Sequence, residues 1–250
     1  MIPRIFALMA NFCKITVILG LFALAFLPVA CNQCTTGTGN AQKEDRLVPE
    51  FSSIDLQCSA NVIIRDRVLS EDNKVVVEAQ SNLLPLISTR VNGETLEIDM
   101  KGCVNSSKTI TVYVHVNEIN EITLSGSGNI ETTNRLGGNE MDVNLDGSGN
   151  LNLGVKTNKI QVNHRGSGNI NLDGNANFIV VEHDGSGDID AMSLKSSDAE
   201  VNLNGSGTVS VFGNRNMKLA LNGSGSIFYG GKPQTLNTTN NGSGEIHEAQ

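Results

Sequence analysis

The stretch Ile160-Gln161-Val162-Asn163-His164-Arg165-Gly166-Ser167-Gly168-Asn169-Ile170 carries the pattern that decides the fold of this chain. Its Gly-Ser-Gly core occurs seven times, and successive copies begin 21, 19, 19, 20, 18 and 19 residues apart. Such regular spacing predicts a repeat architecture in which one structural unit stacks on the next. The predicted corner glycines are Gly126, Gly128, Gly147, Gly149, Gly166, Gly168, Gly185, Gly187, Gly205, Gly207, Gly223, Gly225, Gly242 and Gly244.

Apolar and polar residues alternate on both sides of each Gly-Ser-Gly. Four residues before the first glycine the copies carry Ile122, Val143, Val162, Val181, Val201, Leu219 and Thr238. Four residues after it they carry Ile130, Leu151, Ile170, Ile189, Val209, Ile227 and Ile246. A period of two predicts strands, so each repeat is two short strands meeting at a corner. We expect glycine there because a sharp corner needs a positive φ.

Two short strands cannot bury their apolar faces alone, but stacked copies can. Equivalent residues then form ladders about 4.8 Å apart, with apolar ladders inside and Asn, Ser and Asp ladders outside. Stacked Asn amides can also hydrogen-bond along the axis. The prediction is an all-β solenoid over residues 125–250, preceded by less regular coils over residues 49–124 and without a long helix.

The N-terminus has the features of an export signal. Residues 1–30 contain Arg4, Lys14 and an apolar run but no acidic residue. The ending Leu27-Pro28-Val29-Ala30-Cys31 resembles a bacterial lipobox, which implies lipidation of Cys31; Pro28 departs from that pattern. The alternative is an ordinary secretory signal that leaves Cys31 a free thiol. Either interpretation places the protein outside the cytoplasm, and lipidation would anchor it in the cell envelope. Residues 31–48 are expected to form a flexible tether.

The cysteines and the net charge limit which disulfides can form and which ligands the chain can bind. Cys34, Cys58 and Cys103 remain after Cys13 and Cys31 are assigned, and whether Cys58 and Cys103 are bridged is left open. The formal net charge is −8, and it becomes −10 without the two basic residues of residues 1–30. An acidic chain without basic clusters argues against nucleic-acid binding.

Phe51-x-x-Ile54 followed by serial Ser-Gly-Ser-Gly-Asn-Ile copies resembles the bacterial putative auto-transporter adhesin family, head GIN domain, common in Bacteroidetes envelopes. The copies at 126–130 and 166–170 match best, and the later copies depart after the second glycine. The resemblance implies a right-handed parallel β-helix similar to pectin lyases, no recognised catalytic residues and a role in adhesion.

Two groups of side chains could carry chemistry. His164 and His183 occupy the same repeat position in a Leu-rich ladder, where hydrogen-bonded structural histidines are favoured over a metal site. Beside them, Asp146, Arg165 and Asp184 predict an ion-pair ladder.

Four acids surround one corner, namely Glu182, Asp184, Asp188 and Asp190, with Lys195 the nearest lysine. Polysaccharide lyases of this fold hold calcium with such acids, but solvated outward acids are the simpler interpretation. Phe228 alternates outward and could stack on a sugar ring.

Three functions remain. A non-enzymatic binding or adhesive module, with a glycan or protein ligand, is favoured; a structural or signalling-accessory periplasmic lipoprotein is second, and a carbohydrate-active enzyme third. No catalytic residue, cofactor or metal is predicted. The N-terminal lipid is the expected membrane contact and a homo-oligomer is an open alternative, as is the membrane face.

Overall fold

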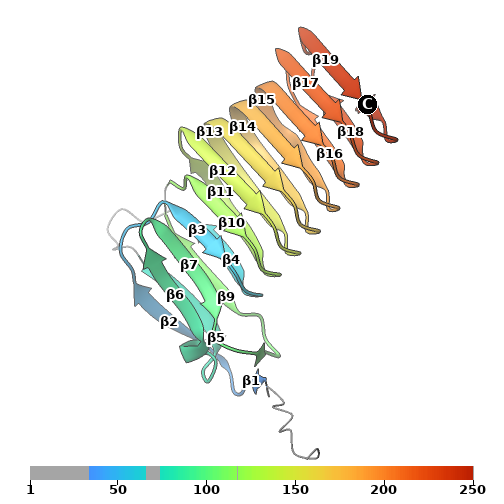
Figure 1. Cartoon of the computed structure of the whole chain (residues 1–250). Helices are drawn as coiled ribbons and strands as arrows, with labels where there is room; N and C mark the ends of the chain where they lie inside the picture. The colour runs from blue at the N-terminus through green and yellow to red at the C-terminus, as the bar shows by residue number, and fades with distance from the viewer. Residues whose placement is uncertain (1–33, 66–73, 117, 250) are drawn as a thin grey trace, which may run out of the picture. The chain divides into compact units, whose positions relative to one another are not determined.

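The computed structural model describes residues 34–65, 74–116 and 118–249, which belong to one structural unit, Cys34–Gln250. They form the predicted all-β solenoid of stacked parallel strands, and their one helical element is the 3-10 turn η1 (Leu84–Leu86). Figure 1 shows the strands as a ladder running from the N-terminal end to the C-terminus. Within the described ranges no helix is long and apolar enough to cross a membrane.

The repeat region has two parallel faces, which are continuous through β13, β14 and β15. We call the strands before the glycine corners the first sheet and those after them the second sheet. Each repeat contributes one strand or half-strand to each sheet, in register with the next, so that Ile170 pairs with both Leu151 and Ile189. The strands are β10 (Glu121–Leu124), β11 (Asn129–Gly137), β12 (Glu140–Leu145), β13 (Leu151–His164), β14 (Ile170–His183), β15 (Ile189–Leu203), β16 (Thr208–Phe212), β17 (Asn216–Leu221), β18 (Ser226–Gly230), β19 (Thr235–Asn240) and β20 (Ile246–Glu248).

Both predicted apolar ladders lie in the interior. In the first six copies, the residues four before the first glycine, from Ile122 to Leu219, are at most 1% exposed. The residues four after it, from Ile130 to Ile227, are buried to the same extent. In the last copy the same positions carry Thr238, which is exposed, and Ile246, which is half-buried. The final coil therefore ends the hydrophobic core with polar side chains, as the end of a solenoid requires.

The corner glycines have a different cause from the one expected. None of the fourteen adopts a positive φ. A Cβ built on any of them would instead lie 1.6–2.3 Å from a backbone carbonyl oxygen of the adjoining coil. The expectation of a left-handed corner was wrong: glycine is required because the corner backbones of stacked coils approach one another too closely for any side chain.

The second corner of three central coils uses a different device. β13, β14 and β15 run without interruption from the second sheet into the first, past the buried small residues Thr157, Ala176 and Ser196. Thr157 Oγ1 donates to a backbone carbonyl, that of Asn139 at 2.9 Å, and Ser196 Oγ donates to the carbonyl of Phe212. Small side chains allow the bend, and the hydroxyls of Thr157 and Ser196 satisfy backbone carbonyls beside it.

The N-terminal part contains coils, as expected, but in a different order from the sequence. β3 (Ser53–Leu56) and β4 (Asn61–Arg65) pair in parallel with β10 and β11 on one side. On the other side they pair with β7 (Thr95–Met100) and β9 (Thr111–His115). The first coil of the chain is thus the second coil of the stack.

The coil β3–β4 turns at Gln57-Cys58-Ser59-Ala60, a corner without glycine. The would-be Cβ atoms of Gly126 and Gly128 lie against the carbonyl oxygens of Cys58 and Ala60, which places these two residues at the glycine positions. Cys58 and Ala60 can carry side chains because the adjoining coil has no tight corner. The chain of that coil loops outward between β7 and β9, through β8 (Val104–Asn105). This loop leaves a hollow of about 600 Å³.

Antiparallel strands close this end, which the prediction of coils alone missed. β6 (Ile87–Asn92) pairs antiparallel with β7, and β5 (Lys74–Gln80) with β9. β2 (Ala41–Leu47) then pairs antiparallel with β5. Such strands run against the coils and end the parallel stack (Figure 1).

The described part of the predicted tether contains paired strands rather than flexible chain. Of residues 31–48, those from Cys34 onward are described, and β1 (Thr35–Thr36) and β2 are paired strands. Arg46 donates to the carbonyl oxygens of Ile87 and Leu84 at 2.6 and 2.8 Å. The sequence of β2 lacks the apolar alternation that predicts a strand. The reason is that β2 is an edge strand: its backbone pairs with β5, while most of its side chains stay exposed.

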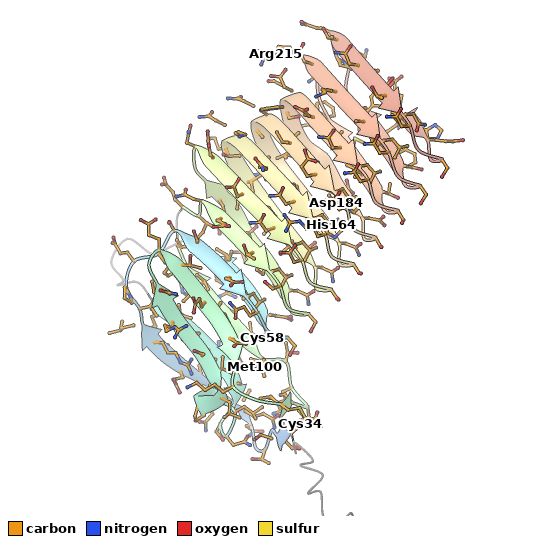
Figure 2. All side chains as sticks on the ribbon, in the orientation of Figure 1. Cys34, Cys58, Met100, His164, Asp184 and Arg215 are labelled. Atoms are coloured by element: carbon orange, nitrogen blue, oxygen red, sulfur yellow. A yellow bond between two sulfur atoms is a disulfide. The ribbon has the colours of Figure 1, made fainter. Side chains whose placement is uncertain are left out.

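The disulfide also differs from the bridge that was considered. Cys34 is bonded to Cys103, and Cys58 is a free, buried cysteine. Burial raises the pKa of the Cys58 thiol. Figure 2 shows Cys34 at the opposite end of the stack from Arg215.

Candidate functional site

The outward face of the second sheet is hollowed over β4, β11, β13 and β14. We name this hollow the amide trough: Glu131, Asn152 and Asn171 form its floor, which the half-buried Ile63 continues on β4, and Asn129, Asn150 and Asn169 form one rim. Its volume is about 500 Å³, and a second hollow of about 360 Å³ shares Asn152 and Asn171 and extends to Asp173 and Asp190. The strand pairing puts each floor residue one coil from the next.

The rim of the amide trough supports the solenoid itself. Asn129 Oδ1 accepts from the backbone N–H of Asn150 at 3.0 Å, and Asn150 Oδ1 accepts likewise from Asn169. The ladder continues to Asp188, whose Oδ1 accepts from the N–H of Thr208 at 2.7 Å. These side chains satisfy backbone donors at the start of each strand, so the predicted asparagine ladder is structural here.

The floor leaves polar groups available to solvent. Asn171 Nδ2 donates to Asn152 Oδ1 at 2.7 Å, and both side chains are exposed. Among the described residues, Asn152 Nδ2 and Asn171 Oδ1 have no hydrogen-bond partner. This one amide donor and one amide acceptor, beside the Glu131 carboxylate, can bind a ligand that offers both kinds of group.

The floor ladder ends at an aromatic pair. Beyond Asp190 it continues through Ser210, Phe228 and His247, each one coil further along. The rings of Phe228 and His247 stack with centroids 5.5 Å apart and an interplanar angle of 25°. The outward direction predicted for Phe228 is confirmed, and its ring is half-buried.

The two predicted histidines lie together in the interior. His164 and His183 are 0% exposed, with ring centroids 4.4 Å apart, and Figure 2 shows His164 midway along the stack. His183 Nε2 lies 2.8 Å from the carbonyl oxygen of Gly187, so Nε2 carries the proton. Its Nδ1 then accepts from the backbone N–H of Gly185.

The two rings also touch through nitrogen. His164 Nδ1 lies 3.1 Å from His183 Nδ1, a contact that needs one proton between the two atoms. Among the described residues, His164 Nε2 has no hydrogen-bond partner. Burial, followed by repulsion from His183, lowers the pKa of His164 from 6.5 to about 4. The pair is therefore a buried structural element of the Leu ladder rather than a metal site.

The four acids around one corner do not converge. Glu182 and Asp184 lie before the corner and accept from Asn202 and Asn204 at 2.7 and 2.8 Å. Asp188 and Asp190 lie beyond it and accept from backbone N–H groups. In the ranges that the structure describes, no three His, Cys, Asp or Glu side chains are grouped to hold a metal ion.

Neither of the other charged features forms a catalytic group. Lys195 Nζ donates to the carbonyl of Met192 at 3.1 Å and lies 3.8 Å from the Phe212 ring centroid. In the predicted ion-pair ladder, Arg165 pairs with Asp146 at 3.3 Å, while Asp184 bonds Asn204 instead.

A family model decides the relationship to known proteins. The model for the putative auto-transporter adhesin, head GIN domain, matches residues 50–233. The chain belongs to the head GIN family. Comparison with curated proteins finds no match.

Three solved structures share this head GIN fold. A putative adhesin from Bacteroides fragilis is 22% identical with a TM-score of 0.79, covering 86% of this chain and 100% of that one. A putative lipid binding protein from Parabacteroides distasonis is 24% identical with a TM-score of 0.69, covering 87% and 100%. A putative adhesin from Parabacteroides merdae is 21% identical with a TM-score of 0.65, covering 86% and 99%.

Cys31 lies outside the described residues, so its lipidation stays a prediction. The floor of the amide trough was missed, although a signal for it exists. Five residues after each first glycine stand Glu131, Asn152, Asn171, Asp190, Ser210, Phe228 and His247, a polar row ending in aromatics. Only the stacking turns that row into a continuous surface.

Proposed function

We propose that this head GIN chain is a non-enzymatic binding module of the cell envelope, an adhesin carried by a lipid on Cys31. The observation that supports this most is the amide trough, an extended polar surface on a rigid stack. The acids that an enzyme would need stand apart and bond their own neighbours. A surface of this kind suits recognition rather than acid–base chemistry, which needs groups within reach of one reacting atom.

The disulfide gives the second candidate function its support. Only two residues separate Cys31 from Cys34, which is bonded to Cys103. Three extended residues reach about 10 Å, so a lipid on Cys31 would hold this end of the solenoid next to the membrane. A domain held so closely also suits an accessory protein on the periplasmic side.

Protease treatment of intact cells, followed by immunoblotting, separates the two candidates. Rapid loss of the protein supports surface exposure and adhesion. Protection until the outer membrane is opened supports the accessory role and contradicts adhesion. Incorporation of labelled palmitate tests the anchor: the wild-type chain should be labelled, and Cys31→Ala should not be. Label in Cys31→Ala, or none in the wild-type chain, would contradict the anchor.

A further inference from the structure

The amide trough has chemistry that selects a class of ligand. Its floor offers the free Nδ2 of Asn152 and the free Oδ1 of Asn171, together with the carboxylate of Glu131. Hydroxyl groups both donate and accept, so a polyol can satisfy all three at once. An aliphatic ligand would leave these groups unpaired.

The spacing of the floor suits a linear chain rather than a compact molecule. Glu131, Asn152, Asn171 and Asp190 occupy successive coils, about 4.8 Å apart as in any parallel sheet. This step is comparable to one pyranose unit in an extended glycan. A glycan lying along the solenoid axis would therefore present one sugar to each coil.

Charge excludes one kind of glycan. Glu131, Asp188 and Asp190 add negative charge along this face, and the chain as a whole is −8. Asp173 is paired with Arg135 at 3.5 Å, so that cation is shared with a protein carboxylate. A uronic-acid or sulfated polymer would meet like charge here, whereas a neutral one would not.

The aromatic pair at the end of the floor adds a stacking surface. His247 covers one face of the Phe228 ring, and the coil on the other side carries the small residue Ser210. A side chain as short as that of Ser210 would not cover the other face of the Phe228 ring, against which the apolar face of a sugar could stack.

From these observations we infer that the amide trough binds a neutral, hydroxyl-rich glycan chain along the solenoid axis, with its end stacked on Phe228. The inference rests on the proposed binding function and names its ligand class. Asn152 and Asn171 bind the hydroxyl groups, and the acidic neighbours exclude polyanions.

Binding to immobilised polysaccharides tests the inference with the full-length chain in detergent. The neutral probes are β-1,4-mannan, β-1,4-xylan and β-1,3-glucan; the acidic probes are polygalacturonate and hyaluronan. We expect at least one neutral probe to bind and neither acidic probe. Asn152→Ala with Asn171→Ala should weaken that binding at least tenfold, and Phe228→Ala should weaken it severalfold.

A matched pair on the same two strands provides the control. Asn177 Nδ2 donates to Asn158 Oδ1 at 2.9 Å, and both side chains are exposed but lie outside the amide trough. Asn158→Ala with Asn177→Ala therefore removes the same type of contact and should leave glycan binding unchanged. Equal losses in the two double variants, acidic probes that bind as well as neutral ones, or no neutral probe bound would each overturn the inference.

Adherence of whole cells separates this inference from the proposed function. If a deletion strain loses adherence and the trough variant restores it fully, adhesion stands and the glycan inference fails. If the purified chain binds a neutral glycan through the trough while deletion leaves adherence unchanged, adhesion fails and the glycan inference stands.

Discussion

The two ends of the solenoid are built by different rules. From β10 onward each coil packs on a near-copy of itself, and backbone contact at the glycine corners sets the spacing. Before β10, the structure is held together differently: by three antiparallel strands, by a coil that is out of chain order and by a disulfide. A repeat needs only one local pattern, whereas the end of a repeat needs a separate solution because its outer face has no further copy.

The largest expected effect concerns the glycine corners. A Cβ at Gly168 would lie 1.6 Å from the carbonyl oxygen of Gly149, which is held in the stack and cannot retreat. We expect Gly168→Ala to lower the free energy of unfolding by about 4 kcal/mol or more. Gly137→Ala is the control, because a Cβ there meets nothing within 4 Å. Denaturant unfolding followed by circular dichroism measures both; similar losses would refute close approach as the cause.

The next effect concerns the other end. The Cys34–Cys103 bond closes a loop across a sequence separation of 69 residues. We expect Cys34→Ser to destabilise the protein by about 2–4 kcal/mol, chiefly by freeing the unfolded chain. Reducing agent should lower wild-type stability to a similar extent and leave Cys34→Ser unaffected. A variant as stable as the oxidised wild type would show that antiparallel pairing alone closes this end.

Acid sensitivity of the repeat is expected from His164, buried beside His183. The pKa of His164 is about 4 in the folded state against 6.5 ordinarily, so between these values the unfolded chain binds the extra proton. Stability is therefore lost as the pH falls from 6.5 to 4, by up to about 3 kcal/mol. His164→Leu with His183→Leu, which extends the Leu ladder, should remove this loss. Unfolding measured at pH 7, 5.5 and 4.5 checks it, with His247→Leu as an exposed control; equal pH slopes in wild type and double variant would count against it.

The smallest effect is electrostatic. A hydrogen bond from Arg215 is the main cause that lowers the pKa of Asp198 from 3.8 to about 2. Because the folded value is the lower one, this contribution is present above pH 4 and lost as the pH falls from 3.8 to 2. In Arg215→Ala the Asp198 pKa, read by NMR titration, should rise toward 3.8, with a stability loss smaller than those above. Arg165→Ala, at an exposed pair, should leave the Asp198 pKa unchanged.

The sequence by itself determined the repeat region. Seven evenly spaced Gly-Ser-Gly copies with alternating apolar residues are compatible with one arrangement, because period-two strands of this length can bury their apolar face only by stacking. The inward ladders, the asparagine ladder and the buried histidines followed from that pattern and are present in the structure.

Tertiary structure decided what depends on partners distant along the chain. β3 pairs with β10, and Cys34 with Cys103, across separations that no local pattern encodes. β2 is a strand only because the edge of β5 needs a partner. The corner glycines avoid a neighbouring carbonyl rather than adopt a special φ, and the floor of the amide trough becomes a surface only when separate coils are stacked. In each case the interaction that matters lies between coils, where the sequence records the residues but not their neighbours.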